Sequence, residues 1–169
     1  MTRVILGIDP GVQGGFAILD AETGKLVDAQ PFPLTDSFYR GKSAKRLDGY
    51  KLATLLDHHM ALADGEMQAV VEAVSSRPRQ AGQFQFGINT GIIHGILYAH
   101  GIPFTLVAPA TWKSFFGIKR EEGETKQDKK SEARELAARL YPEHADKFRR
   151  IKDDGVAEAV LIALSRVGQ

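Results

Sequence analysis

Three apolar segments, widely separated in the chain, each contain a single carboxylate. Asp9 ends the first apolar run, and Glu72 is the one charged residue of Met67–Ser76. Glu158 is the one polar residue of Val156–Leu164. An ionised carboxylate in such surroundings destabilises the fold unless it meets a cation or strong hydrogen-bond donors. Any one of them could form an inward salt bridge or lie at a sheet edge, but three together predict a fold in which they converge.

Short strands are expected at the beginning of the chain. Val4–Asp9 is a run of mostly branched aliphatic residues, and Gly15–Leu19 and Leu26–Phe32 follow it after turn residues. Sequence-adjacent strands with short connections predict an antiparallel meander. The stretch Pro33–Asp48 is polar and basic, and we expect it to be a mobile loop.

The remainder of the chain alternates helical and strand patterns. Helices are expected from about Asp48 to Ala63, from near Gln83 to His100, over Pro109–Phe116, over Lys126–Leu140 and over about Asp154–Val167; strands are expected at Ala69–Val74 and Phe104–Val107, and loops at Ser75–Ala81 and Gly117–Thr125. This order predicts an α/β fold in which a five-stranded mixed sheet is flanked by helices. A length of 169 residues fits a single domain, residues 1–169.

Three glycines mark one face of the predicted Gln83–His100 helix. Gly87, Gly91 and Gly95 are spaced four residues apart. Each glycine weakens a helix by about 1 kcal/mol relative to alanine. We therefore expect close packing on this face, either against the sheet or against a second subunit.

The charges are unevenly distributed although 22 Lys and Arg nearly balance 21 Asp and Glu. No acidic residue occurs from Ala73 to Arg120, and a second basic cluster comprises Arg40, Lys42, Lys45, Arg46 and Lys51. A basic surface suits a polyanionic partner. The chain has no cysteine, which excludes disulfides and thiolate zinc sites. Without a signal-peptide pattern or a membrane-length apolar run, we expect a cytoplasmic protein that is not secreted (host-cell cytoplasm if phage-encoded).

Convergent carboxylates are ligands suited to Mg²⁺ or Mn²⁺. Asp153 and Asp154 are further candidates, although either could simply cap the last helix. Helical spacing favours Asp154, which lies four residues before Glu158, whereas the direction of Asp153 is free if it precedes the helix. The pattern alone does not choose between them.

The motifs resemble the RuvC-type Holliday junction resolvases (crossover junction endodeoxyribonucleases), particularly the phage, bacterial and chloroplast branch. The resemblance rests on Gly7-Ile-Asp-Pro-Gly11, a strand ending in Glu72, Phe84-Gln-Phe-Gly87, Val107-Ala-Pro-Ala-Thr-Trp-Lys113 and Lys152–Leu164. It implies a ribonuclease-H-like fold and a homodimer that nicks four-way DNA junctions with Mg²⁺, giving 5′-phosphate ends. Two ions per site are expected, with Mn²⁺ able to substitute.

The family's four acidic positions carry over as Asp9, Glu72, Asp153 and Glu158. Two departures stand out. In the family the fourth acid is usually Asp, whereas this chain has Glu158. The family's third acid usually lies three residues before the fourth, and this chain has Gly155 at that position. Asp154 therefore stays a candidate ligand beside Asp153. The expected roles are Asp9 bridging the ions, Glu72 and Glu158 on opposite ions, and Asp153 completing the second site.

Other residues are expected to contact DNA. Lys113 and Lys130 resemble the family's functional lysines, although Lys130 could equally lie on a solvated helix face. Phosphate contacts are expected from Arg77, Arg79, Arg40, Lys42, Lys45 and Arg46. Phe84 or Phe86 could stack on an unpaired base, or pack at the helix start. Trp112 is expected in the core.

Other functions fit parts of the same pattern. A related ribonuclease-H-like nuclease could act on RNA, flaps or forks, because proteins that recognise shape leave little sequence trace. A catalytically inactive junction-binding module is a further alternative, which the intact acid set disfavours. The segment Asp9–Gly15 also resembles the first phosphate loop of actin-like ATP-binding domains. That class needs two such domains, and no second phosphate loop or Walker A sequence is present.

Overall fold

The computed structural model describes residues 3–11, 13–39, 41–63, 66–73, 83–118 and 126–168, with the side chains of 39, 42 and 126–131 excepted. The predicted loop Ser75–Ala81 lies outside these residues, as does most of Gly117–Thr125. No helix in the described ranges has the length and apolar character needed to cross a membrane.

A five-stranded mixed sheet forms the centre of the molecule. Its strands are β1 (Val4–Asp9), β2 (Gly15–Asp20), β3 (Leu26–Pro31), β6 (Met67–Glu72) and β7 (Phe104–Val107), arranged in the order β3-β2-β1-β6-β7. The first three strands pair antiparallel, and β1, β6 and β7 are parallel. The predicted fold class is therefore confirmed, including the antiparallel meander at its start.

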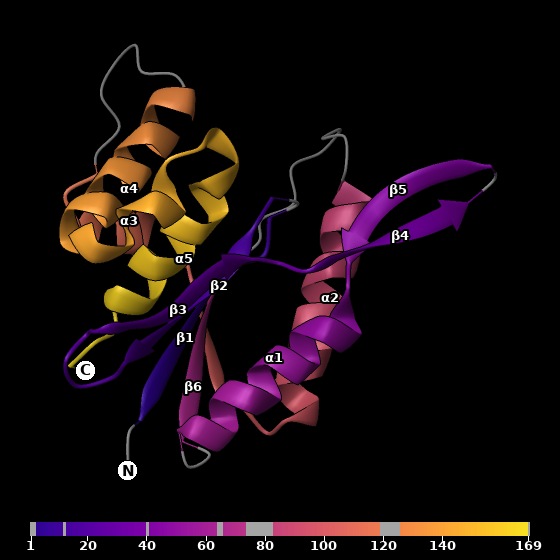
Figure 1. Cartoon of the computed structure of the whole chain (residues 1–169), viewed down its shortest axis with the longest axis horizontal. Helices are drawn as coiled ribbons and strands as arrows, with labels where there is room; N and C mark the ends of the chain where they lie inside the picture. Colours follow the sequence, from indigo (N-terminus) through magenta and orange to yellow (C-terminus); the bar gives the residue numbers. More distant parts are fainter. Residues whose placement is uncertain are drawn as a thin grey trace.

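Helices cover both faces of the sheet (Figure 1). On one side lie α1 (Gly49–Leu62) and α2 (Gln83–Ala99). On the other lie α3 (Pro109–Phe115), α4 (Lys126–Leu140) and α5 (Asp154–Leu164). Two short 3₁₀ segments that the sequence did not predict, η1 and η2, fill the connection between α4 and α5; they comprise Pro142–Phe148 and Ile151–Asp153.

Alternation along β1 divides the apolar core into two layers. Ile5 packs in the layer that contains α5, whereas Leu6 and Ile8 pack in the layer that contains α1 and α2. Side chains of a strand point alternately to the two faces of its sheet. Asp9 therefore lies on the α5 side, like Ile5 and Gly7.

Two glycines allow α5 to lie directly on β1 and its following loop. A Cβ atom on Gly7 would collide with the backbone of Ala159, and one on Gly155 would collide with the backbone of Gly14. Gly14 and Gly155 also form an isolated bridge. Only glycine permits such close backbone approach. These contacts hold α5 antiparallel to β1, with its first turn beside the loop that follows Asp9.

The prediction of a mobile loop at Pro33–Asp48 is wrong. This stretch forms an antiparallel hairpin of β4 (Leu34–Tyr39) and β5 (Lys42–Leu47), which projects from the body of the molecule (Figure 1). Leu47 is buried at its base, and Asp36 forms a 2.9 Å ion pair with Lys45 across the strands. Such cross-strand pairs stabilise a hairpin whose polar composition conceals its strand character.

The glycine face of α2 is not covered by the sheet. Cβ atoms added to Gly87, Gly91 and Gly95 would meet no described atom within 4 Å. The helix instead buries Asn89, Ile93 and Leu97. The sheet is therefore excluded as the partner of this face within the described residues, and packing against a second subunit stays a prediction.

Candidate active site

Asp9 and Glu72 lie at the carboxyl edge of the parallel strands. The register of β1 and β6 pairs Ile8 with Val71, which places Asp9 and Glu72 one step further along neighbouring strands. Neighbouring strands are about 4.8 Å apart. Both residues are half-buried, and both face α5 by the alternation of their strands. Two of the three predicted acids are thus neighbours on one face of the sheet.

Each of these carboxylates accepts a hydrogen bond that fixes it. Asp9 Oδ1 accepts from the backbone N–H of Gly11 at 3.0 Å. Glu72 Oε2 accepts from the indole Nε1–H of Trp112 at 2.8 Å. Trp112 lies in the core as expected and is fully buried. The sequence did not predict the hydrogen bond from Trp112 to Glu72. It indicated only that a short helix containing Trp112 follows β7.

Glu158 comes to the same region from α5. It is 8% exposed, and its Oε1 lies 3.3 Å from Nζ of Lys113. The same ammonium lies 4.9 Å from the centre of the Trp112 ring. Contacts therefore lead from Glu72 through Trp112 and Lys113 to Glu158, so that α3 connects the edge of the sheet to α5.

Asp153 and Asp154 are buried, and each has an arginine partner. Arg150 donates to both carboxylate oxygens of Asp153, from its side chain and from its backbone N–H. Burial by itself would raise the pKa of Asp153, but these hydrogen bonds and the charge of Arg150 outweigh it and hold the pKa below its usual value. Asp154 Oδ1 lies 2.7 Å from Nε of Arg134 on α4.

Asp153 does not cap α5 with its side chain. Asp153 occupies the N-cap position, but it makes no side-chain hydrogen bond to that helix. It closes the turn of η2 instead, through the backbone N–H of Arg150. Asp154 is the first residue of α5, where the helix was expected to begin, and it lies four residues before Glu158 on that helix. Which of the two could bind a metal ion stays a prediction.

The donor chemistry at this edge suits a divalent cation. Carboxylate oxygens are the ligands that Mg²⁺ and Mn²⁺ prefer. As the side chains lie, however, no group of three or more acidic or histidine residues in the described ranges is close enough to hold one ion. At Glu158 the positive charge is supplied by the ammonium of Lys113. The predicted four-acid ligand set therefore stays a prediction.

The residues predicted to contact DNA have different surroundings. Phe84 is 83% exposed at the start of α2, whereas Phe86 is half-buried. Lys45 is ion-paired with Asp36 on the hairpin, and Arg46 is half-buried nearby. The remaining candidates lie outside the described residues or have side chains outside them: Arg40, Arg77 and Arg79 in the first group, Lys42 and Lys130 in the second.

Comparison with known proteins identifies the fold. No family model matches the sequence, and no curated protein matches it. Among solved structures, Thermus thermophilus RuvC in complex with a Holliday junction substrate is similar, with a TM-score of 0.59 and 14% identity over 96% of this chain and 92% of that chain.

Two further structures agree. Another T. thermophilus RuvC structure matches with a TM-score of 0.55 and 17% identity, over 96% of this chain and 92% of that one. The yeast mitochondrial Holliday junction resolvase Ydc2 matches with a TM-score of 0.52 and 17% identity, over 98% of this chain and 78% of that one. The predicted resemblance is confirmed at the level of the fold, which is the ribonuclease-H-like fold of RuvC.

Proposed function

We propose that this protein is a structure-selective endodeoxyribonuclease that resolves four-way DNA junctions by Mg²⁺-dependent hydrolysis of phosphodiester bonds. The observation that carries the proposal is the position of Asp9 and Glu72 on neighbouring parallel strands, facing a helix that supplies Glu158. Acids at the carboxyl ends of parallel strands are placed where such sheets bind ligands. The fold it shares with RuvC supports the same proposal.

Asp9, Glu72 and Glu158 would hold the divalent ions, with Asp153 or Asp154 completing the second site. When bound, two such ions would activate a water molecule and stabilise the leaving 3′-oxygen, so the products carry 5′-phosphates. Glu158 would exchange its ion pair with Lys113 for a metal ion. The released ammonium of Lys113 could then neutralise a DNA phosphate.

DNA binding would extend from the acids towards the hairpin. Phe84 is exposed and available to stack on a base at the centre of the junction. Arg46 and Lys42 on the hairpin would contact backbone phosphates, together with Arg40, Arg77 and Arg79. Lys45 would contribute less than its neighbours, because the carboxylate of Asp36 offsets its charge.

A homodimer would supply two active sites for two symmetric nicks. The face of α2 formed by Gly87, Gly91 and Gly95 is open in the described structure and has small residues that permit close helix contact. Light scattering would measure the mass of the particle in solution. A monomer at the concentrations where cleavage occurs would contradict this part of the proposal.

The test of the activity is a panel of labelled substrates, comprising a four-way junction, a fork, a flap, a linear duplex and a structured RNA, each with and without Mg²⁺. Symmetric, Mg²⁺-dependent nicks confined to the junction are expected. Cleavage confined to RNA, flaps or forks would assign the chain to a related nuclease instead. ATP turnover without any nuclease activity would favour an actin-like ATP-binding domain.

Variants separate catalysis from folding and binding. Asp9→Asn and Glu72→Gln should lose cleavage while retaining junction affinity and the wild-type circular dichroism spectrum. Glu132→Gln is the matched control, because Glu132 is an exposed acid on α4. If the first two variants lost junction binding, the acids would have a structural role.

A further inference from the structure

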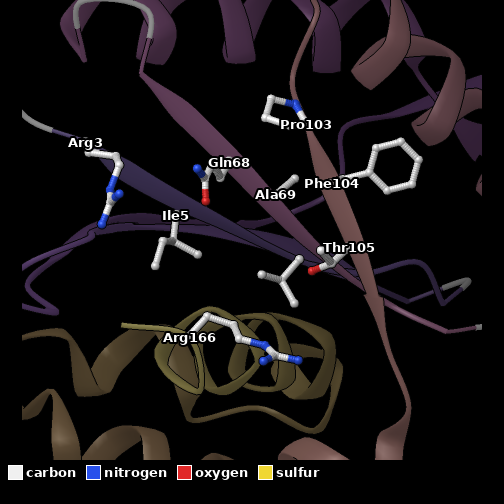
Figure 2. Close-up of a pocket in the computed structure, with 9 residues that line it drawn as sticks. Arg3, Ile5, Gln68, Ala69, Pro103, Phe104, Thr105 and Arg166 are labelled. Carbon is white, nitrogen blue, oxygen red and sulfur yellow. The ribbon is translucent and has the colours of Figure 1, made fainter. Parts of the chain in front are cut away.

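A cavity of about 370 Å³ lies on the α5 side of the sheet, at the amino-terminal end of the parallel strands. Its walls come from four segments: the start of β1, the first half of β6, the start of β7 and the turn after α5 (Figure 2). The lining residues are Arg3, Ile5, Gln68, Ala69, Val70, Pro103, Phe104, Thr105 and Arg166. This cavity is therefore built from the same strands as the candidate active site.

The cavity and the acids are at opposite ends of those strands. Ile5 pairs with Gln68, and Val70 pairs with Thr105, on the face that also carries Asp9. Four residues of strand separate Ile5 from Asp9, about 13 Å, and two separate Val70 from Glu72, about 7 Å. A ligand in the cavity would occupy a site distinct from the acid edge.

Gln68 is unusual for its position. β6 lies between two parallel neighbours, β1 and β7, and strands of this kind are normally apolar on both faces. Gln68 is nevertheless exposed, as is Thr105 on β7. The cause is the placement of α5, which packs mainly on β1 and β2 and less on β6. The sheet therefore offers polar groups in a hollow that α5 borders but does not fill.

The chemistry of the lining favours an anion. Arg3 precedes β1 and Arg166 follows α5, and the described residues that line the cavity include no acid. Figure 2 shows Arg166 across the cavity from the strands that carry Gln68 and Thr105, with Arg3 towards one end. Guanidinium groups bind phosphate and carboxylate through paired hydrogen bonds, and amide and hydroxyl groups can add further donors.

The rest of the lining limits what the ligand can be. Ile5 and Val70 give the cavity an apolar floor, which suits a small organic body. The ring of Phe104 turns away from the cavity and packs 4.9 Å from the ring of His94. It is therefore not available for stacking on a base within the cavity. The volume is at the lower end of the range for small-molecule sites, about 300–1,000 Å³.

We propose that this cavity binds a small phosphomonoester, with Arg3 and Arg166 on its phosphate group and Gln68 and Thr105 donating further hydrogen bonds. A phosphomonoester carries a charge of about −1.5 to −2 near neutral pH, which two guanidinium groups match. The proposal is independent of the nuclease activity, because none of these residues belongs to the acid edge.

The test is a titration of the ¹⁵N-labelled full chain followed by NMR, with ribose 5-phosphate, ribose and inorganic phosphate as probes. Saturable shifts are expected for the Gln68 side-chain amide, the Arg166 Nε–H and the backbone of Thr105. Ribose 5-phosphate should give them at lower concentration than inorganic phosphate, and ribose should give none. The absence of saturable shifts with either phosphate would overturn the proposal.

Variants assign the binding to named groups. Arg166→Gln should weaken ribose 5-phosphate binding by about tenfold, equivalent to about 1.4 kcal/mol. Thr105→Val keeps the side-chain volume at an exposed position and should weaken binding less. Arg139→Gln, at an exposed arginine on α4, is the control and should have no effect. Equal affinities for the wild type and the Arg166→Gln variant would contradict the assignment.

Two further arms distinguish this site from the proposed nuclease site. The Asp9→Asn variant should bind ribose 5-phosphate as the wild type does, whatever its nuclease activity. A short blunt DNA duplex without terminal phosphates should leave the signals of Gln68 and Thr105 unchanged. If that duplex shifted them while ribose 5-phosphate did not, the cavity would contact the DNA backbone and the small-ligand proposal would be wrong.

Discussion

Trp112→Phe tests whether the indole N–H fixes Glu72 at the edge of the sheet. The hydrogen bond is 2.8 Å long and its acceptor is a carboxylate. A hydrogen bond to a charged group contributes about 1.5–3 kcal/mol, and we expect the lower end because Glu72 is only half-buried. Phenylalanine also fills less of a fully buried site, at a cost of about 1–2 kcal/mol. The free energy of unfolding should therefore fall by about 2.5–4 kcal/mol.

A double-mutant cycle separates the hydrogen bond from the lost packing. Glu72→Ala removes the acceptor, so the Trp112→Phe change should cost less in that background than in the wild type. We expect a coupling free energy of about 1.5 kcal/mol from urea denaturation followed by circular dichroism. Junction cleavage by Trp112→Phe should fall by at least about tenfold with junction affinity retained. Effects that add to within about 0.5 kcal/mol would refute the claim that Trp112 positions Glu72.

Three further predictions concern the elements that support the site. Because the pKa of Asp153 is lowered in the folded state, its ion pair stabilises the protein above the unfolded pKa and is lost as pH falls through the folded pKa. Arg150→Gln should therefore be less stable than wild type in urea at neutral pH, and the difference should shrink as the pH falls below the usual range for an aspartate, whereas a constant difference would contradict this. Gly7→Ala should lower the free energy of unfolding by about 1–3 kcal/mol through its collision with α5. Gly91→Ala, which meets no described atom of its own chain, should raise the free energy of unfolding of the monomer, measured at dilute concentration, by up to about 1 kcal/mol; equal effects would contradict the packing. Burial and the nearby charge of Glu143 raise the pKa of Tyr141 to about 12. The Tyr141 hydroxyl donates a 2.7 Å hydrogen bond to the backbone carbonyl of Gly24. Tyr141→Phe should cost about 1–2 kcal/mol in thermal or urea unfolding, and an unchanged stability would show that this hydrogen bond contributes nothing.

Local patterns predicted most of the fold. The apolar run of β1 and the helical spacing of Lys126–Leu140 were sufficient to locate those elements, because each buries a regular apolar face. The β4–β5 hairpin was missed for the opposite reason. Among the hairpin side chains that the structure describes, only Leu47 is buried, and cross-strand pairs such as Asp36–Lys45 have no signature in hydrophobic periodicity.

The candidate site was predictable only in part. Position at the end of an apolar strand indicated that Asp9 and Glu72 matter, and strand register places them side by side. Their partners could not be predicted, because Trp112 is separated from Glu72 by 40 residues. The arginine that contacts Asp154 lies on a different helix, so the choice between Asp153 and Asp154 depends on tertiary contacts.

The central claim is that Asp9, Glu72 and Glu158 together bind divalent ions. Titration of Mn²⁺ into the full chain, followed by electron paramagnetic resonance of the free ion, measures this binding without any DNA. We expect saturable Mn²⁺ binding that weakens by at least about tenfold in Asp9→Asn and in Glu158→Gln and is unchanged in Glu132→Gln. Wild-type Mn²⁺ affinity in both site variants, or no binding to the wild type, would contradict it.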